Sequence, residues 1–164
     1  MTQGAVVAYV GLGSNLADPR AQVERAIDAL SAMPHSRVLR RSHLYASAPW
    51  GVVDQPEFVN AVVAIETTAS AHELMQALLA IERAAGRERD GTRWGPRVLD
   101  LDLLLYADAD IDEPGLRVPH PHLHERAFVL RPLAEIAPQC VLPQHGPVAD
   151  LAECVDGTGL RRID

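Results

Sequence analysis

Hydrophobic and polar residues follow two different periods along this chain, and these periods predict alternating strands and helices. Four segments, each too short for a typical helix, predict strands, and all but the second are mainly apolar. They are Val6–Gly11, Arg37–Tyr45, Phe58–Glu66 and Val98–Tyr106. Apolar residues at helical spacing follow the first and the third segment, in the stripes Val23, Ala26, Ile27 and Leu30, and Leu74, Leu78, Ile81 and Ala85. The predicted order is strand, helix, strand, strand, helix, strand.

Both predicted helices begin at a recognisable cap. Asp18 followed by Pro19 joins an N-cap side chain to a residue whose φ suits the first helical turn. Ser70 and Glu73 have the spacing of a capping box. The segment 11–15 (G-L-G-S-N), before the first helix, resembles part of a dinucleotide-binding loop but lacks the third glycine. We interpret it as a tight turn between strand and helix.

The last third of the chain has weaker signals. An acidic turn is predicted at Asp108–Pro114, and two prolines exclude regular structure from Val118–His122. Further on, the pattern predicts a short helix interrupted by Pro132, a last strand and a weak helix, at Glu125–Ile136, Cys140–Leu142 and Val148–Val155. The whole order predicts an α+β fold, a ferredoxin-like antiparallel sheet with helices packed on it. We expect residues 1–164 to form a single domain.

Composition narrows the class of protein. With 48% hydrophobic and 23% charged residues the chain is typical of a soluble globular protein, and it has no apolar run as long as a membrane span. Met1–Val10 lacks the pattern of a secretory signal. Cys140 and Cys154 form no Cys-x-x-Cys pair and cannot make a disulfide framework. We therefore expect a cytoplasmic protein that does not bind membranes.

The distribution of charge argues against nucleic acid as a partner and indicates a small anion as a ligand. The net charge of −7 argues against a nucleic-acid-binding surface. Arg83–Arg97 nevertheless holds five of the fifteen basic residues and only two acids, which suits a local anion site. All fifteen basic residues are Arg, so a Walker-A lysine and a Schiff-base lysine are excluded.

Two aspartates give the clearest chemical signal. Asp100 and Asp102 are two positions apart in a predicted strand, so they project from the same face. Two adjacent carboxylates repel each other unless a cation holds them, and oxygen ligands combined with substrate phosphates suit Mg²⁺. An Asp-x-Asp pair is also common on solvated strand faces. Leu104 continues the aspartate face as an apolar residue, and a loop of arginines precedes the strand. Together these features favour a nucleotide–Mg²⁺ site.

Aromatic residues are scarce, and four of the seven lie at or beside predicted loops: Trp50, Phe58, Trp94 and Phe128. A planar heteroaromatic ligand could stack on them. Alternatively, these rings close the ends of the core. Asn60 shares a strand face with Phe58 and could offer a donor and an acceptor to the edge of a heterocycle, although such an Asn often caps a strand ladder.

Three alternating histidines, His120, His122 and His124, raise the alternative of a zinc site. Pro121 distorts their spacing, and no Cys completes a recognisable zinc motif. A single histidine that bonds a phosphate is the better interpretation, and His120, between two prolines, is the most rigidly held.

Five strings of residues, in order along nearly the whole chain, resemble the 6-hydroxymethyl-7,8-dihydropterin pyrophosphokinase family of folate biosynthesis. They are A-Y-V-G-L-G-S-N-L, D-Q-P-E-F-V-N-A-V, I-E-R-x-x-G-R-x-R, R-W-G-P-R-V-L-D-L-D-L-L-L-Y and V-P-H-P-H-L-H-E-R-A-F-V-L-R-P-L. The resemblance implies an enzyme that transfers pyrophosphate from ATP to the hydroxymethyl group of a reduced pterin and releases AMP.

The resemblance also implies roles for individual residues. Asp100 and Asp102 would be ligands of two Mg²⁺ ions and would be catalytic together with Arg87 and Arg97. The implied ATP contacts are Glu82, Arg87, Arg89, Arg93, Arg97, His120 and Arg126. The implied pterin contacts are Ser47, Pro49, Trp50, Phe58, Asn60, Trp94 and Phe128.

Some positions depart from the family pattern. Phe58 stands where tyrosine can occur, Trp50 where leucine can, and Pro121 where tyrosine can; Gly115 and Arg117 also differ. Stacking needs only the ring, so Phe58 preserves it, whereas the ATP contacts of residues 115–121 stay open. The alternative from another class is a ferredoxin-like binding or regulatory module without catalysis. Mg²⁺-dependent ATP turnover would distinguish the two.

Overall fold

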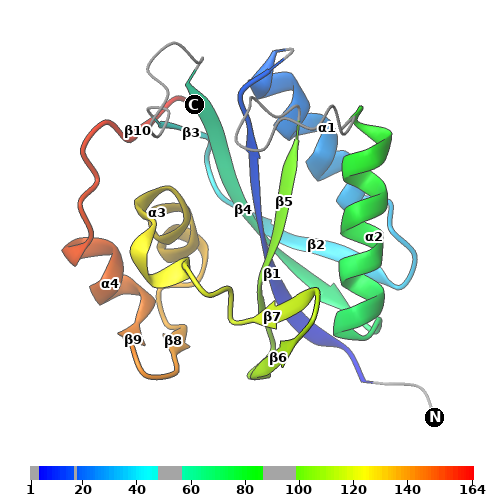
Figure 1. Cartoon of the computed structure of the whole chain (residues 1–164). Helices are drawn as coiled ribbons and strands as arrows, with labels where there is room; N and C mark the ends of the chain where they lie inside the picture. Colours follow the sequence, from blue (N-terminus) through cyan, green and yellow to red (C-terminus); the bar gives the residue numbers. More distant parts are fainter. Residues whose placement is uncertain (1–3, 17, 48–56, 87–98) are drawn as a thin grey trace.

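One antiparallel sheet lies between two layers of helices (Figure 1). The computed structural model describes residues 4–16, 18–47, 57–86 and 99–164. Within them the main sheet has six strands in the order β10–β3–β4–β1–β5, and β2 also pairs with β4. These strands are β1 (Val6–Ser14), β2 (Ser36–Arg41), β3 (Tyr45–Ser47), β4 (Phe58–Thr67), β5 (Asp100–Tyr106) and β10 (Arg161–Arg162). The helices are α1 (Pro19–Ser31), α2 (Ala71–Ala84), α3 (Ala127–Ile136) and α4 (Val148–Cys154).

The central strands have the predicted ferredoxin-like arrangement. β2, β4, β1 and β5 lie side by side in that order, and each neighbouring pair is antiparallel. α1 follows β1, and α2 follows β4. Both predicted caps are present, because the Asp18 side chain accepts the Ala21 N–H and the Ser70–Glu73 capping box is complete. The predicted α+β class is therefore confirmed.

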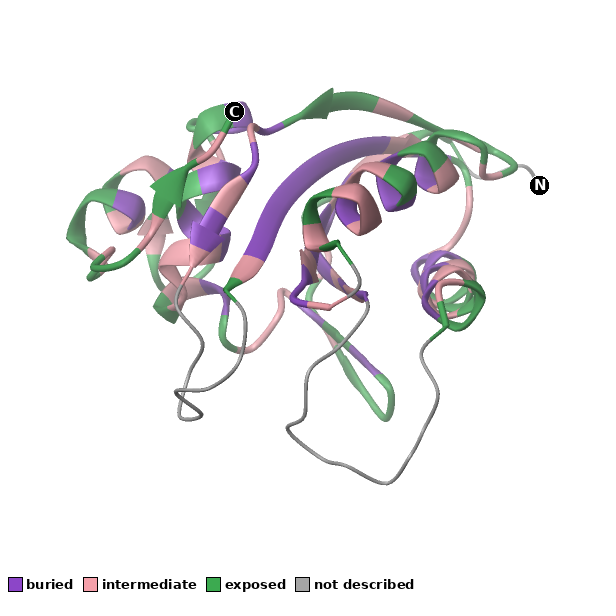
Figure 2. Cartoon of the chain, turned by 90° about the horizontal axis from the view of Figure 1, so that it is seen from above, coloured by how far each residue is buried: buried purple, intermediate pink, exposed green. Residues whose placement is uncertain are grey.

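The two faces of the sheet bury separate cores. On one face, residues such as Val63 and Leu103 pack against the apolar stripes of α1 and α2. On the other face, Val62 and Leu104 pack against α3 and α4. Figure 2 shows buried residues gathered along the sheet and on the sides of the helices that face it. Strands buried on both faces explain the nearly continuous apolar runs in the sequence.

β1 is longer than predicted, which corrects the interpretation of residues 11–15 as a tight turn. Gly11 and Gly13 pair with β4 on one side and with β5 on the other, and Ser14 still pairs with Val59. The ladders on both sides satisfy these backbone groups and keep the glycines extended. Glycine is common in tight turns, so Gly11 and Gly13 favour a turn when the sequence is considered alone.

The predicted second strand, Arg37–Tyr45, is instead two strands, β2 and β3. The break lies at Ser42, whose N–H donates to the Val62 carbonyl while its hydroxyl accepts the Val62 N–H. The hydroxyl takes the place of a backbone carbonyl, so the chain can leave the regular ladder without exposing β4. β3 then pairs with the first residues of β4, and β10 pairs with β3.

The last third also differs from expectation. The predicted acidic turn contains a strand, β6 (Ile111–Glu113), that forms a hairpin with β7 (Leu116–Val118). α3 begins at Ala127, after the 3₁₀ turn η1 (Leu123–Glu125), and continues through Pro132. Buried Leu130 and Leu133 anchor it on both sides of that proline. The predicted last strand and weak helix are confirmed as β8 (Val141–Leu142) and α4. Their neighbours β9 (Gly146–Pro147) and β10 have too few residues for a recognisable period.

Candidate active site

The two aspartates lie at the start of β5 and project from one face, as predicted. Leu101 and Leu103 belong to the core under α1 and α2, so the alternating Asp100 and Asp102 face the side of α3. Both aspartates are half-buried, and Leu104 continues toward the α3 core. The carboxylates therefore occupy the end of a strand whose remaining residues are buried.

A strip without side chains lies beside the aspartates. Gly13 of β1 is paired with Asn60 of β4 and with Asp100 of β5. Gly11 is paired in the same way with Val62 and Asp102. Residues in register share a face, so the glycines separate Asn60 from the carboxylates without any side chain between them. This glycine pair is not predicted from the sequence, although Gly-x-Gly in a strand has the same two-residue spacing as Asp-x-Asp.

Asn60, Ser47 and Phe58 come together at the same end of the sheet. Asn60 is only 4% exposed, and its Nδ2 donates to the Ser47 Oγ over 2.7 Å. Ser47 is paired with Phe58, whose ring is half-buried. The structure thus joins three of the seven predicted pterin contacts through two neighbouring strands. The predicted contacts Pro49, Trp50 and Trp94 lie outside the described residues.

Glu82 of α2 is buried behind the aspartates. Its side chain is 3% exposed, and its Oε1 accepts the N–H of Leu101 over 3.0 Å. Glu82 therefore contacts the backbone between Asp100 and Asp102 from the opposite side of the sheet. The alternative of a solvated charge at this position is wrong, whereas its contact with ATP stays a prediction.

His120 flanks the aspartates at the edge of the sheet. The backbone N–H of His120 donates to the Leu104 carbonyl over 3.0 Å, and the ring Nε2 lies 4.0 Å from the Asp102 Oδ1. Burial, and then the positive charge of Arg126, lowers the pKa of His120 from 6.5 to about 4. The ring is therefore neutral at pH 7, and its contact with Asp102 is not an ion pair. A neutral imidazole can still donate one hydrogen bond.

Phe128 lies in the first turn of α3, on the same side of the sheet as Asn60. The Arg126 guanidinium carbon lies 5.6 Å from the centre of the Phe128 ring, which is a cation–π distance. The structure thus places Arg126 and Phe128 together near the start of α3. The remaining predicted ATP contacts, Arg87, Arg89, Arg93 and Arg97, lie outside the described residues.

The zinc alternative finds no support in the part of the chain that the structure describes. No group of three or more His, Cys, Asp or Glu side chains could hold a metal ion there. His122 and His124 lie 3.3 and 3.4 Å from the Glu125 carboxylate, and His124 also stacks on His145 with ring centres 3.8 Å apart, whereas His120 lies beside Asp102.

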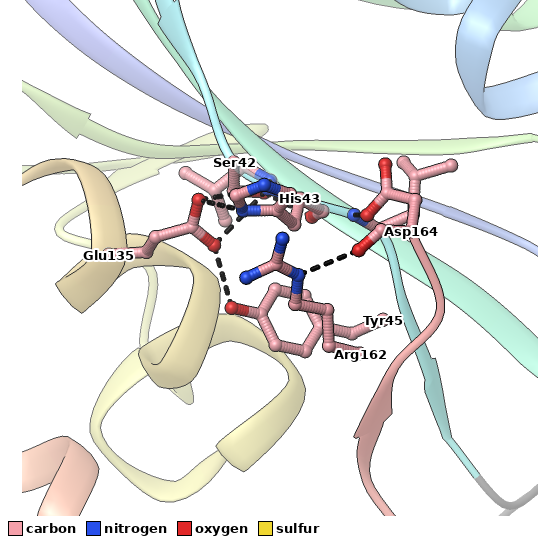
Figure 3. A network of polar contacts seen from close by, with 8 residues as sticks. Ser42, His43, Tyr45, Glu135, Arg162 and Asp164 are labelled. Atoms are coloured by element: carbon pink, nitrogen blue, oxygen red, sulfur yellow. Dashed lines mark hydrogen bonds and ion pairs between the residues drawn. The ribbon is translucent and has the colours of Figure 1, made fainter.

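A polar cluster ties α3 to β3 (Figure 3). The Glu135 carboxylate accepts the Tyr45 hydroxyl over 2.6 Å, the His43 N–H over 3.0 Å and contacts the His43 Nδ1 over 2.7 Å. Burial and the bond to Glu135 raise the pKa of the Tyr45 hydroxyl. At the other side of β3, the Asp164 carboxylate accepts the Leu44 N–H. These bonds hold the strand that carries Ser47 against the helix that carries Phe128.

Comparison with known proteins identifies the family. The sequence model of the 7,8-dihydro-6-hydroxymethylpterin-pyrophosphokinase (HPPK) family matches residues 9–138. The chain belongs to this family. The HPPK of Pseudomonas aeruginosa is 48% identical over 94% of this chain and 95% of its own length. The HPPK of Methylorubrum extorquens is 46% identical over 96% of this chain and 98% of its own length.

Solved structures agree on the fold. Wild-type HPPK-DHPS of Plasmodium falciparum, solved with pteroate, superposes with a TM-score of 0.73 at 12% identity. The match covers 93% of this chain but only 43% of that longer protein. At 12% identity this similarity shows a shared fold and nothing more. Family membership makes this HPPK a pyrophosphokinase of folate biosynthesis. Among the described residues no helix is long and apolar enough to cross a membrane.

Proposed function

We propose that this HPPK transfers the pyrophosphoryl group of ATP to the hydroxymethyl oxygen of 6-hydroxymethyl-7,8-dihydropterin and releases AMP. We further propose that residues 1–164 form a single pyrophosphokinase domain. The observation that carries the proposal is the row Asn60, Gly13 and Asp100 across three strands. In this row, the Asn60 amide, which could hydrogen-bond a heterocycle, lies across Gly13 from the Asp100 carboxylate, which could hold a metal–phosphate complex.

The carboxylates fit magnesium. Asp100 and Asp102 offer oxygen atoms from one strand face, and carboxylate oxygens are ligands that Mg²⁺ prefers. These two residues would hold two Mg²⁺ ions. When bound, such ions offset the charge of the phosphates and align them for in-line displacement. Without a cation, the two carboxylates would repel each other.

The pterin would lie between the sheet and α3. Phe58 and Phe128 approach this space from β4 and from the start of α3, and each supplies a ring for stacking. The Asn60 amide, bonded to Ser47, would hydrogen-bond the edge of the pterin. The family resemblance supports further contacts from Pro49, Trp50 and Trp94.

ATP would lie on the other side of the aspartates. Neutral His120 would donate a hydrogen bond to a phosphate oxygen without requiring a proton from solvent. Arg126 would add positive charge beside it, and Glu82 would hold β5 in place or contact ATP itself. By resemblance, Arg87 and Arg97 would grip the transferred phosphates, with Arg89 and Arg93 nearby.

In the reaction, the hydroxymethyl oxygen forms a bond to the β-phosphorus of ATP, and the bond from that phosphorus to the α–β bridging oxygen breaks. AMP leaves with the bond's electrons, and the hydroxyl proton is released. The chain's contribution is mainly to position the substrates and to compensate charge.

Chromatography of a reaction with Mg-ATP and 6-hydroxymethyl-7,8-dihydropterin tests the proposal. Equal amounts of AMP and pterin diphosphate are expected, and EDTA should stop the reaction. Formation of ADP without AMP would show simple kinase chemistry. Absence of any turnover, with both ligands still bound, would favour a binding or regulatory module.

A further inference from the structure

Gly13 stands where its backbone conformation does not demand glycine. Neither Gly13 nor Gly11 has the positive φ that excludes other residues, and both lie in a strand paired on two sides. Glycine weakens a strand interior, and alanine would be more stable in an ordinary strand by about 0.5–1 kcal/mol. Glycine in such a place often marks the close approach of a ligand or of another backbone.

The two glycines differ in what lies above them. A Cβ on Gly11 would lie 3.5 Å from the Leu104 side chain, so the core already covers that position. A Cβ on Gly13 would meet only the Asn60 Oδ1, at 3.3 Å, within 4 Å. The 3.5 Å contact at position 11 is an ordinary van der Waals distance, so an alanine there would fit without displacing Leu104. At position 13 an added methyl group would press on the Asn60 amide oxygen and would otherwise enter space that no described residue fills within 4 Å.

We propose that Gly13 is a positioning residue for the pterin's hydroxymethyl arm, which would lie directly against the β1 backbone between Asn60 and Asp100. This inference rests on the proposed function. Neighbouring strands are about 4.8 Å apart, so Asn60 and Asp100 stand about 10 Å apart across Gly13. A bicyclic ring bonded at its edge by Asn60 would reach toward Asp100 with its one-carbon arm. A methyl group on residue 13 would occupy that path.

Gly13→Ala tests the inference, with Gly11→Ala as the matched control on the same face of the same strand. We expect Gly13→Ala to lower kcat/KM for the pterin by about 10²-fold, because a displacement of about 1 Å at the reacting group has that effect. Its KM for ATP and its thermal stability should stay near those of the parent protein. Gly11→Ala should keep the parent kcat/KM. Equal kinetics for Gly13→Ala and the parent would overturn the inference.

A pterin that lacks the hydroxymethyl arm shows whether residue 13 acts on the arm or on the ring. 7,8-Dihydropterin without the 6-hydroxymethyl group should bind equally well to the parent and to Gly13→Ala. Equal weakening of both pterins would mean that the methyl group disturbs the ring site, which would overturn the assignment to the arm.

The contact with Asn60 needs its own control, because the added Cβ could act by displacing that amide. Gly13→Ala should still lower kcat/KM in an Asn60→Ala background, where the 3.3 Å contact is gone. Loss of the effect there would overturn the inference. This comparison also serves if the single variant does not fold. Failure of the parent to form AMP would refute the proposed function, a result distinct from all of these.

Discussion

The Glu82 carboxylate lies 3.0 Å from the amide nitrogen of Leu101, the residue between Asp100 and Asp102. One buried carboxylate on α2 therefore fixes the backbone that carries two half-buried carboxylates on the opposite face of the sheet. This geometry suggests that Glu82 positions the metal-binding strand and that its substitution would disturb the site indirectly.

Glu82→Ala should lower the free energy of unfolding by about 1–3 kcal/mol, since it leaves a buried N–H without its acceptor. It should also lower kcat. Glu82→Gln keeps an acceptor oxygen and should recover most of both quantities. Chemical denaturation and steady-state kinetics measure the effects, with Gln76→Ala on the exposed side of α2 as the control. Unchanged stability of Glu82→Ala with a raised KM for ATP alone would instead indicate direct contact with ATP.

Replacement of either aspartate should abolish most of the activity and leave the protein folded. Asp100→Asn or Asp102→Asn should lower kcat by more than about 10²-fold, the usual effect of removing one electrostatic stabiliser. In EDTA each variant should be as stable as the parent or slightly more stable, because one of two like charges is gone. Asp108→Asn, at an exposed position after β5, is the control. If a variant is largely unfolded but its remaining native fraction is fully active, the two aspartates have a structural role and not a catalytic one.

The Glu135 cluster should influence pterin binding from outside the site. Glu135→Ala removes the acceptor shared by Tyr45 and His43, so α3 and β3 lose a direct connection. We expect a loss of about 1–2 kcal/mol in stability and a raised KM for the pterin, because Phe128 and Ser47 lie on these two elements. The KM for ATP should change less. Glu153→Ala, exposed on α4, is the comparison, and an equal change in both KM values would argue against this role.

His120 should make the metal-free protein less stable in acid. Its pKa is about 4 in the folded chain, below the ordinary histidine value of 6.5, so between these pH values the unfolded chain binds more protons. Stability is therefore unaffected above pH 6.5 and falls as the pH drops toward 4, by up to about 3 kcal/mol. NMR titration in EDTA measures the pKa, and denaturation of His120→Asn should show a smaller loss. A His120 signal that titrates near 6.5 would refute this prediction.

The local pattern of residues was sufficient to predict much of the fold. The capping box at Ser70, the shared face of Asp100 and Asp102, and the shared face of Phe58 and Asn60 follow from residues within a few positions of each other. Period and cap chemistry are properties of single elements, so they can be interpreted without knowing the partners. The same is true of the helix–strand order that predicted the ferredoxin-like sheet.

Only the tertiary structure decided which distant residues meet. The sequence by itself determined that Asp100 and Asp102 share a face, yet the pairing of Gly13 with both Asn60 and Asp100 depends on the register of three strands separated by two helices. The burial of Glu82 and the pairing of β10 with β3 likewise follow from the packing of whole elements. Register is set by matching buried faces across the sheet, and a shift by one residue would turn each side chain to the other face. No short segment carries that information, because each strand acquires its register only against its neighbours.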